Sequence, residues 1–481
     1  MAAQFRLGSM DSLLDPHDPH FGRLWAFVLL AIIALSFRLS TQPRQNCDFT
    51  LANPPKWYEL KIFKQIQFLF NGINELDKAR EQANGKPFRL LTNSREIIVL
   101  PPAYAEVLHA DNRLSFAKYF ADEFDGDGKT PGLEPYTLIA DPCKRVPKLV
   151  TKRLTRSLNT IPIKMSSEAS FAIEYNFGGR VVNSIIAAFT INMAPSFARP
   201  LIRRFSPVVR RARNDYQAAR EFIEPLINAR REGRGMDREA GTRVRAFDDI
   251  VDWIDSENQE STCDPVALQM VLNVAAVHPI AALVTNTIAF LAADPSTFGP
   301  LRQELLAELR SDGCQAAALN RLKLLDSAIK ESLRLKPPGV FGMHRAALED
   351  MQLPNGMHIH KGDRVFVDTS RMRDPSIYES PNTYDLYRFH RMRSRPDQAQ
   401  KAPLVVTSPE HLAFGHGAQA CPGRFFAALV GKVVLSHLLL KYDWRLAPDS
   451  DTTSLAIGLT KRINPKLKLL YRRRKEEFEL S

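Results

Sequence analysis

The order of hydrophobic and polar positions predicts a mainly helical chain. Residues 264–293 form a long, mostly apolar stretch that ends at Asp294-Pro295, as expected for a buried helix. Two further helical stretches, residues 298–310 and 322–335, follow it. Near the C-terminus, residues 425–440 are almost entirely apolar, so we expect a helix that is buried on most sides.

Two other stretches favour β-strands. Residues 89–100 and 356–368 alternate apolar and polar residues in part and are bounded by turn-forming residues. The pair Asn355-Gly356 is typical of a tight turn leading into the second strand. The fold class that follows is mainly α with small β-sheets.

An apolar stretch near the N-terminus predicts a membrane anchor. Residues 24–37 are almost wholly apolar and lie between Arg23 and Arg38. The stretch is shorter than the ~20 residues that span a bilayer comfortably, but flanking arginines extend its reach. No small-residue cleavage site follows, so we expect an uncleaved transmembrane anchor at residues 21–39; a re-entrant or interfacial segment is the alternative. The flanking basic residues favour a lumenal segment at residues 1–20 and a cytoplasmic body.

The charge distribution limits which binding partners are expected, and the cysteine content indicates the redox state of the thiols. The chain has 65 basic and 53 acidic residues, with clusters of basic residues at 199–213 and 472–475. In the first cluster apolar residues alternate with arginines, which is typical of contact with anionic lipid, and no nucleic-acid-binding motif accompanies it. We expect a lipid membrane or an acidic electron-transfer partner and no nucleic acid; a solvated charge run is the alternative. The five cysteines are scattered, which indicates reduced thiols.

One cysteine lies in a glycine-rich loop directly before the apolar C-terminal helix. Residues 414–424 are Phe-Gly-His-Gly-Ala-Gln-Ala-Cys-Pro-Gly-Arg. Glycines let the backbone approach a flat ligand closely. Amides at the helix start favour negative charge on Cys421, because the helix dipole lowers a thiol pKa. The loop therefore predicts a thiolate that binds a metal; a buried, inert cysteine is the alternative.

This loop resembles the heme-binding signature of the cytochrome P450 family, Phe-x-x-Gly-x-Arg/His-x-Cys-x-Gly. Phe414, Gly417, Cys421 and Gly423 match the signature, and Gln419 stands where the family usually has a cation that faces a heme propionate. The resemblance implies heme b as cofactor, with Cys421 as the axial ligand of the iron.

Further segments resemble the same family in the same order. Glu331 and Arg334 lie three residues apart in a predicted helix, and Arg388 lies in a segment similar to the family's meander. The resemblance implies that the three form a buried structural triad. It also implies that Arg345 binds a heme propionate. The implied architecture is a single two-lobed heme domain at residues 61–481, after a linker at residues 40–60.

The oxygen-binding helix of the family departs from its usual pattern in this chain. Ala275, Ala276, His278 and Pro279 align with the motif Ala-Ala/Gly-x-Glu/Asp/His-Thr. Pro279 replaces the threonine whose hydroxyl helps relay protons to oxygen. A proline inside a helix should kink it near Ala275, which keeps a groove beside the iron. His278 is a candidate proton relay; a histidine that is simply packed is the alternative.

A second departure concerns length. The region of residues 165–195 is shorter than the two core helices that the family has there, and we expect residues 154–165 to form the helix across one heme face. Part of the helical core is then missing, by natural loss or through a mispredicted splice near Gly178-Gly179. The family's Trp-x-x-x-Arg heme contact is absent as well, which leaves as candidates Lys152, Arg153 and Arg156.

Together the resemblances imply a single-pass enzyme of the endoplasmic reticulum membrane that inserts oxygen from O2 into a hydrophobic small molecule. Electrons from NADPH would arrive through NADPH-cytochrome P450 reductase, because the chain has no Gly-x-Gly-x-x-Gly fingerprint of its own. Residues 275–278, 414–417 and 472–478 resemble fungal members that oxidise terpenoids and indole-diterpenes in secondary metabolism. Two alternatives stay open. Pro279 would suit a heme-thiolate isomerase, dehydratase or peroxide user, and the shortened core would suit a degenerate, non-catalytic membrane protein.

Overall fold

The computed structural model describes residues 48–141, 144–154, 156–159, 178–194, 197–244, 252–253, 264–475 and 477. The predicted lumenal segment and transmembrane anchor lie outside the described residues. So do three of the five cysteines and residues 160–177.

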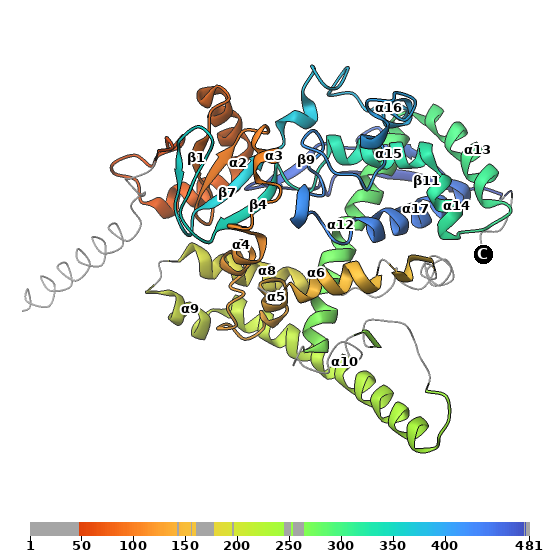
Figure 1. Cartoon of the computed structure of the whole chain (residues 1–481), viewed down its shortest axis with the longest axis horizontal. Helices are drawn as coiled ribbons and strands as arrows, with labels where there is room; N and C mark the ends of the chain where they lie inside the picture. The colour runs from red at the N-terminus through yellow and green to blue at the C-terminus, as the bar shows by residue number, and fades with distance from the viewer. Residues whose placement is uncertain are drawn as a thin grey trace, which may run out of the picture.

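The described chain is mainly helical, and its strands form small sheets, as predicted (Figure 1). The α-helices are α2 (Lys61–Ala83), α3 (Tyr104–Leu108), α4 (Phe116–Glu123), α5 (Glu134–Ile139), α6 (Arg145–Leu149), α8 (Gly178–Met193), α9 (Arg199–Phe205), α10 (Pro207–Glu239), α12 (Pro265–Ala293), α13 (Phe298–Leu309), α14 (Ala316–Arg321), α15 (Lys323–Leu335), α16 (Arg388–Met392) and α17 (Arg424–Lys441). Short π or 3-10 turns are η2 (Val150–Leu154), η3 (Arg156–Asn159), η4 (Pro295–Thr297), η5 (Ser370–Arg373), η6 (Ala399–Lys401) and η7 (Gly417–Gln419). The strands are β1 (Phe88–Leu91), β2 (Glu96–Leu100), β3 (Leu114–Ser115), β4 (Phe341–Ala347), β5 (Met351–Gln352), β6 (His358–Ile359), β7 (Arg364–Asp368), β8 (Tyr442–Leu446), β9 (Ser454–Ile457), β10 (Thr460–Ile463) and β11 (Leu469–Arg473).

The largest sheet has five strands in the order β1-β2-β7-β4-β3, with α2 and α4 beside it (Figure 1). Strands β2 and β7 pair in parallel, and the other pairs are antiparallel. The register of β4 against β7 shifts between Gly342 and Arg345, where Met343 has a φ of 52°. Such a bulge bends the strand and redirects the side chains around it.

Both strand predictions were too long. Residues 89–100 contain a hairpin, in which β1 pairs with β2 around a turn, and residues 356–368 contain the separate strands β6 and β7. The turn at Asn355-Gly356 is confirmed, because Gly356 has a φ of 85° between the paired strands β5 and β6. Partial alternation marks each strand but does not show where the chain reverses.

The predicted helices of the second half are confirmed, and they build the main hydrophobic core. Helices α12, α13, α14, α15 and α17 supply most of that core. Asp264 begins α12 by accepting hydrogen bonds from the amides of Val266 and Ala267, with Pro265 in the first turn. The helix then continues through Pro279 to Ala293. Among the described residues α12 alone is long and apolar enough to cross a bilayer, a test that a core helix also passes.

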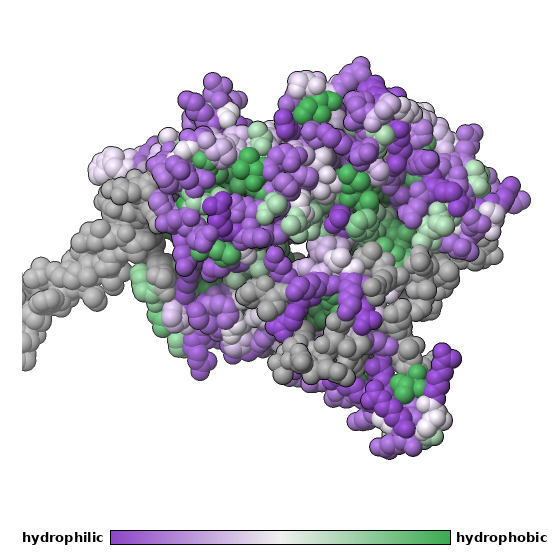
Figure 2. Space-filling model, in the orientation of Figure 1, coloured by the Kyte–Doolittle hydropathy of each residue, from purple (hydrophilic) through white to green (hydrophobic). Residues whose placement is uncertain are grey.

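Helical structure begins earlier than the predicted helix of residues 154–165. Helix α6 begins at Arg145 and η2 follows it to Leu154, and η3 covers Arg156–Asn159 within the predicted range. The remainder of residues 154–165 lies outside the described residues. Beyond this region, α10 projects from the body (Figure 1), and the visible surface of its far end is largely hydrophilic (Figure 2).

Candidate active site

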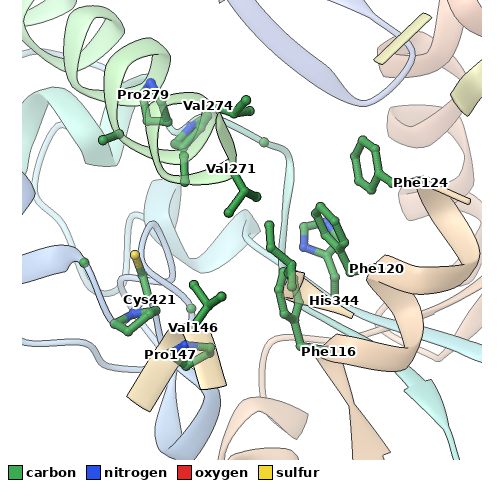
Figure 3. Close-up of a pocket in the computed structure, with 18 of the residues that line it drawn as sticks. Phe116, Phe120, Phe124, Val146, Pro147, Val271, Val274, Pro279, His344 and Cys421 are labelled. Carbon is green, nitrogen blue, oxygen red and sulfur yellow. The ribbon is translucent and has the colours of Figure 1, made fainter. Parts of the chain in front are cut away.

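A single large cavity connects most of the predicted site residues. It encloses about 2480 Å³ and is lined by α4, α6, α12, β4, the cysteine loop and the hairpin of β9 and β10. In Figure 3 the sulfur of Cys421 points toward α12, with Pro279 on the far side of the space. Val146 and Pro147 of α6 lie beside Cys421 in the same view.

The loop that carries Cys421 is fixed by its own backbone and by α3. The amide of Cys421 donates to the carbonyl of Phe414 at 2.8 Å, and the amide of Ala418 donates to the carbonyl of His109 at 3.0 Å. Gly417 has a φ of 75°, and a Cβ atom there would lie 2.2 Å from the His109 carbonyl oxygen. Only glycine therefore fits at this position. Gly423 directly precedes α17. A Cβ atom at this position would lie 4.0 Å from the Cys421 sulfur.

The predicted lowering of the Cys421 pKa is wrong for the protein alone. Burial raises the pKa of the Cys421 thiol, and the amides of Gly423 and Arg424 and the charge of Arg424 oppose that effect only in part. The side chain is accessible because it faces the cavity, yet protein atoms surround it on its other sides. Loss of hydration outweighs the helix start here, because a cysteine in apolar surroundings has few groups to replace water.

The turn of α12 at Pro279 presents small, apolar side chains to the cavity, whereas Gln269 and Asn273, nearer the start of the helix, are polar lining residues. Ala275, Ala276 and Pro279 line the space, whereas His278 is exposed and is not among the lining residues. No described lining residue of this turn carries a hydroxyl. The geometry therefore does not support a proton relay by His278. Neighbouring residues on a helix point in different directions, so His278 does not share the orientation of Pro279 toward the cavity.

Both polar atoms of the Gln419 side chain are hydrogen bonded to backbone groups. Its Oε1 accepts a hydrogen bond from the Phe116 amide at 2.8 Å, and its Nε2 donates to the Leu114 carbonyl at 2.7 Å. The side chain thereby ties the cysteine loop to the end of β3 and the start of α4. Where the family usually has a cation, Gln419 instead connects two parts of the backbone by hydrogen bonds.

Arg345 has the properties that a heme propionate requires of its partner. The residue is 2 % exposed and lines the cavity, and its Nη1 donates to the His344 carbonyl at 2.8 Å. Its Nε and Nη2 are buried without a hydrogen-bond partner, and burial lowers the pKa of its guanidinium to about 10. A buried, unpaired cation needs an anion. The sulfur, the cavity and this guanidinium together fit a heme group with its negatively charged propionates.

Lys152 lines the same cavity, whereas Arg153 is not among its lining residues, and the side chain of Arg156 lies outside the described set. Of the two candidates whose side chains the structure describes, Lys152 is the one that lines the cavity.

Glu331, Arg334 and Arg388 are hydrogen bonded to one another in the core. Arg334 donates to both oxygens of Glu331, at 2.7 and 2.8 Å, and Arg388 donates to one of them at 3.0 Å. Glu331 and Arg334 are fully buried and Arg388 is 7 % exposed. Further donors of the two arginines bond backbone carbonyls, including those of Met372 and Glu379. None of the three residues lines the cavity, so the triad belongs to the surrounding core.

Sequence reasoning missed the aromatic wall of the cavity. Phe116, Phe120 and Phe124 lie on the side of the space away from Cys421 (Figure 3). The ring centroids of Phe120 and Phe124 are 4.4 Å apart. Their spacing of four residues places them on one face of α4 and at its end, a signal that was present in the sequence. The sequence did not show where this face lies relative to the cysteine loop.

Comparison with known proteins agrees with this site. The model of the family "Cytochrome P450" matches residues 141–469. The chain is 31% identical to the cytochrome P450 monooxygenase eqxH of Fusarium heterosporum, over 98% of each chain. It is 33% identical to the cytochrome P450 monooxygenase pyr3 of Aspergillus fumigatus, over 99% of this chain and 98% of that protein. These two alignments extend over 518 and 521 positions, more than the 481 residues of this chain.

Among solved structures, the fold is similar to that of the retinoic acid-bound cyanobacterial CYP120A1. The TM-score is 0.61 at 18% identity, over 85% of this chain and 96% of that one. At this identity the likeness concerns the fold.

Proposed function

Because the chain belongs to the cytochrome P450 family, we propose that Cys421 is the axial thiolate of its heme iron and that the cavity above it is where substrate is oxidised. The family membership makes the protein a heme-thiolate monooxygenase that uses O2 and electrons supplied by a reductase. The observation that carries the proposal is the shared cavity of the Cys421 sulfur and the unpaired Arg345 guanidinium.

When bound, a heme with a thiolate ligand supplies the chemistry that activates dioxygen. The residues of the chain contribute position and environment. Cys421 would provide the ligand and Arg345 would neutralise a propionate, and Lys152 and Gly423 line the same space. Ala275, Ala276 and Pro279 place small, apolar groups on the α12 side of the cavity, and Asn273 of the same helix also lines it. Phe414 and Gly417 hold the loop in place through backbone contacts.

We propose a bulky hydrophobic substrate, a terpenoid or an indole-diterpene of fungal secondary metabolism. The size of the cavity and the aromatic wall of α4 support this class, because apolar surface of that extent favours a large apolar ligand. The two fungal relatives carry the name monooxygenase, which agrees with the type of reaction.

We further propose that the protein is anchored in the endoplasmic reticulum membrane by residues 21–39, with its body in the cytoplasm and NADPH-cytochrome P450 reductase as electron donor. The support is the apolar N-terminal stretch between two arginines. The interleaved arginines and apolar residues of α9 add to it, since Leu201 and Phe205 are 62 % and 65 % exposed there.

The deciding experiment is the absorbance of the reduced, carbon monoxide-treated protein. We expect the red shift that a thiolate-bound heme produces, and its loss in Cys421→Ala. The matched control is Cys314→Ala, because Cys314 is a buried cysteine in the core away from the cavity. A wild-type protein without the red-shifted band, or a Cys421→Ala variant that keeps it, contradicts the proposal.

Pro279 supports a second candidate, a heme-thiolate enzyme that performs isomerisation, dehydration or a peroxide-dependent reaction. No described side chain on the adjoining turn of α12 offers a hydroxyl to the cavity. Turnover with NADPH and reductase, compared with turnover driven by peroxide, separates the two candidates. Product from NADPH supports the monooxygenase, and Pro279→Thr should then increase the fraction of electrons that end in product. Product from peroxide alone supports the second candidate.

A further inference from the structure

A buried polar cluster lies on the side of the cavity away from Cys421. It consists of Arg364 on β7, Glu123 at the end of α4, and Ser94 in the turn between β1 and β2. All three line the cavity and are at most 7 % exposed. The adjoining wall consists of the aromatic residues of α4 on one side and of Thr92 and Asn93 on the other.

The hydrogen bonds within the cluster leave one donor group unused. Nη1 of Arg364 bonds the carboxylate of Glu123 and lies 3.5 Å from the Ser94 hydroxyl, which itself donates to Glu123 at 3.1 Å. Nη2 of Arg364 is buried and has no hydrogen-bond partner. An unsatisfied buried guanidinium nitrogen costs free energy, so a bound acceptor at that point is favoured.

Aromatic rings hold Arg364 in place. Its guanidinium lies 5.5 Å from the ring centroid of Tyr119. Tyr119 in turn stacks on His344, with centroids 5.4 Å apart, and packs edge-on against Phe366. Figure 3 shows His344 next to Phe120 and across the space from Cys421. Because Tyr119 contacts both His344 and Arg364, the cluster lies near this end of the cavity. A ligand fixed by Arg364 would therefore extend from there toward the cysteine.

The charges select the kind of acceptor. Arg364 is paired with Glu123, so these two groups carry no net charge between them. Arg95 adds a further cation close enough to interact with both. A carboxylate on the ligand would lie close to the Glu123 carboxylate and be repelled by it. A neutral carbonyl oxygen accepts from Nη2 without that cost.

Resting on the proposed function, we propose that Arg364 is a specificity-determining residue that binds a neutral carbonyl oxygen, a ketone or lactone, on an otherwise apolar substrate. Nη2 of Arg364 is the donor, Glu123 and Ser94 fix the guanidinium, and the aromatic wall of α4 covers the apolar part of the ligand.

The test uses three ring compounds of equal size: cyclododecanone, cyclododecane and cyclododecanecarboxylic acid. Each is titrated into the heme-loaded, full-length protein, and the change in the heme spin state gives Kd. We expect the ketone to bind at least about 10-fold more tightly than the hydrocarbon, which corresponds to one hydrogen bond to a charged donor. The acid should bind more weakly than the ketone.

The decisive variant is Arg364→Lys. Lysine keeps a positive charge for Glu123 but has no planar second edge, so the preference for the ketone should disappear. Arg462→Lys is the matched control, because Arg462 also lines the cavity but is exposed, and it should keep the preference. If Arg364→Lys does not fold, the variant with both Glu123→Gln and Arg364→Gln removes the guanidinium without leaving a buried charge.

A preference for the ketone that is equal in wild type and in the Arg364 variants overturns the inference, and so does tightest binding of the acid. A wild-type protein without the red-shifted carbon monoxide band instead contradicts the proposed function. The two failures are therefore distinguishable in the same preparation.

Discussion

The side-chain oxygen of Gln419 accepts a hydrogen bond from the backbone amide of Phe116 at 2.8 Å, across 303 residues of sequence. The same side chain donates to the carbonyl of Leu114. The loop that presents the cysteine and the helix that bears the aromatic wall are thus joined by one residue. A change at Gln419 should act on both.

We predict that Gln419→Arg, which restores the cation usual in the family, destabilises this chain by about 1–3 kcal/mol. Arginine has no acceptor atom, so the Phe116 amide loses its partner. Thermal or urea unfolding measures the change. The red-shifted carbon monoxide band should remain, because Cys421 is untouched, while Kd for cyclododecanone rises. Unchanged stability and affinity would show that the connection is dispensable.

Substitution of Glu331, which binds both arginines of the buried triad, should lower stability strongly. Glu331→Ala leaves the guanidinium groups of Arg334 and Arg388 buried without their carboxylate, so the free energy of unfolding should fall by about 3–5 kcal/mol. Urea denaturation measures the fall as a lower midpoint. Lys118→Ala breaks a pair with Asp122 in which the lysine is 49 % exposed, and it should change stability by less than about 0.5 kcal/mol. Equal effects of both variants would refute a central role of the triad.

Acid should destabilise the fold through His411. The residue is 2 % exposed, and burial, together with repulsion by Lys330, lowers the pKa of its ring to about 3. In the unfolded chain its pKa returns to about 6.5, so between these values the unfolded state binds more protons. Stability present above pH ~6.5 is then lost as the pH falls toward the folded pKa, by at most about 1.4 kcal/mol per pH unit.

Unfolding by urea at a series of pH values between ~6.5 and ~4 checks this slope. His411→Gln removes one of two buried histidines with a lowered pKa and should reduce the slope. His344, whose pKa burial lowers to about 4, supplies the remainder. His390→Gln is the control, because His390 is exposed on α16, and it should leave the slope unchanged. A slope that is identical in His411→Gln and in wild type would contradict the assignment.

The shortened region at residues 165–195 predicts a longer form of the chain. The alignments with eqxH and pyr3 extend over more positions than this chain has residues. In addition, the apolar helix α12 is exposed in its middle. Val277 is 58 % exposed, whereas Val271 and Val284 on either side are buried. An uncovered apolar face within a core helix is what the loss of a packed segment leaves behind.

Sequencing of transcripts across residues 170–182 should reveal an additional in-frame coding segment. Val277→Asp provides a structural check. The substitution should be tolerated in the chain of 481 residues and destabilise the longer form, where the face is covered. Transcripts that contain only the present sequence would instead establish natural loss.

The sequence by itself determined the parts of this protein that depend on neighbouring residues. The helices around Asp264, Glu331 and Cys421 follow from local hydrophobic spacing, caps and turn residues, and the family resemblance of the cysteine loop follows from its order of residue types. Spacing of three residues was enough to put Glu331 and Arg334 on one helix face.

Only the tertiary structure decided the rest, because burial and long-range contacts depend on how the elements pack. It gave Gln419 two backbone partners, turned His278 away from the cavity, and left donors of Arg345 and Arg364 unpaired beside it. It also reversed the expected direction of the Cys421 pKa. The helix start that lowers that pKa is visible in the sequence, but the loss of water that raises it comes from elements distant along the chain.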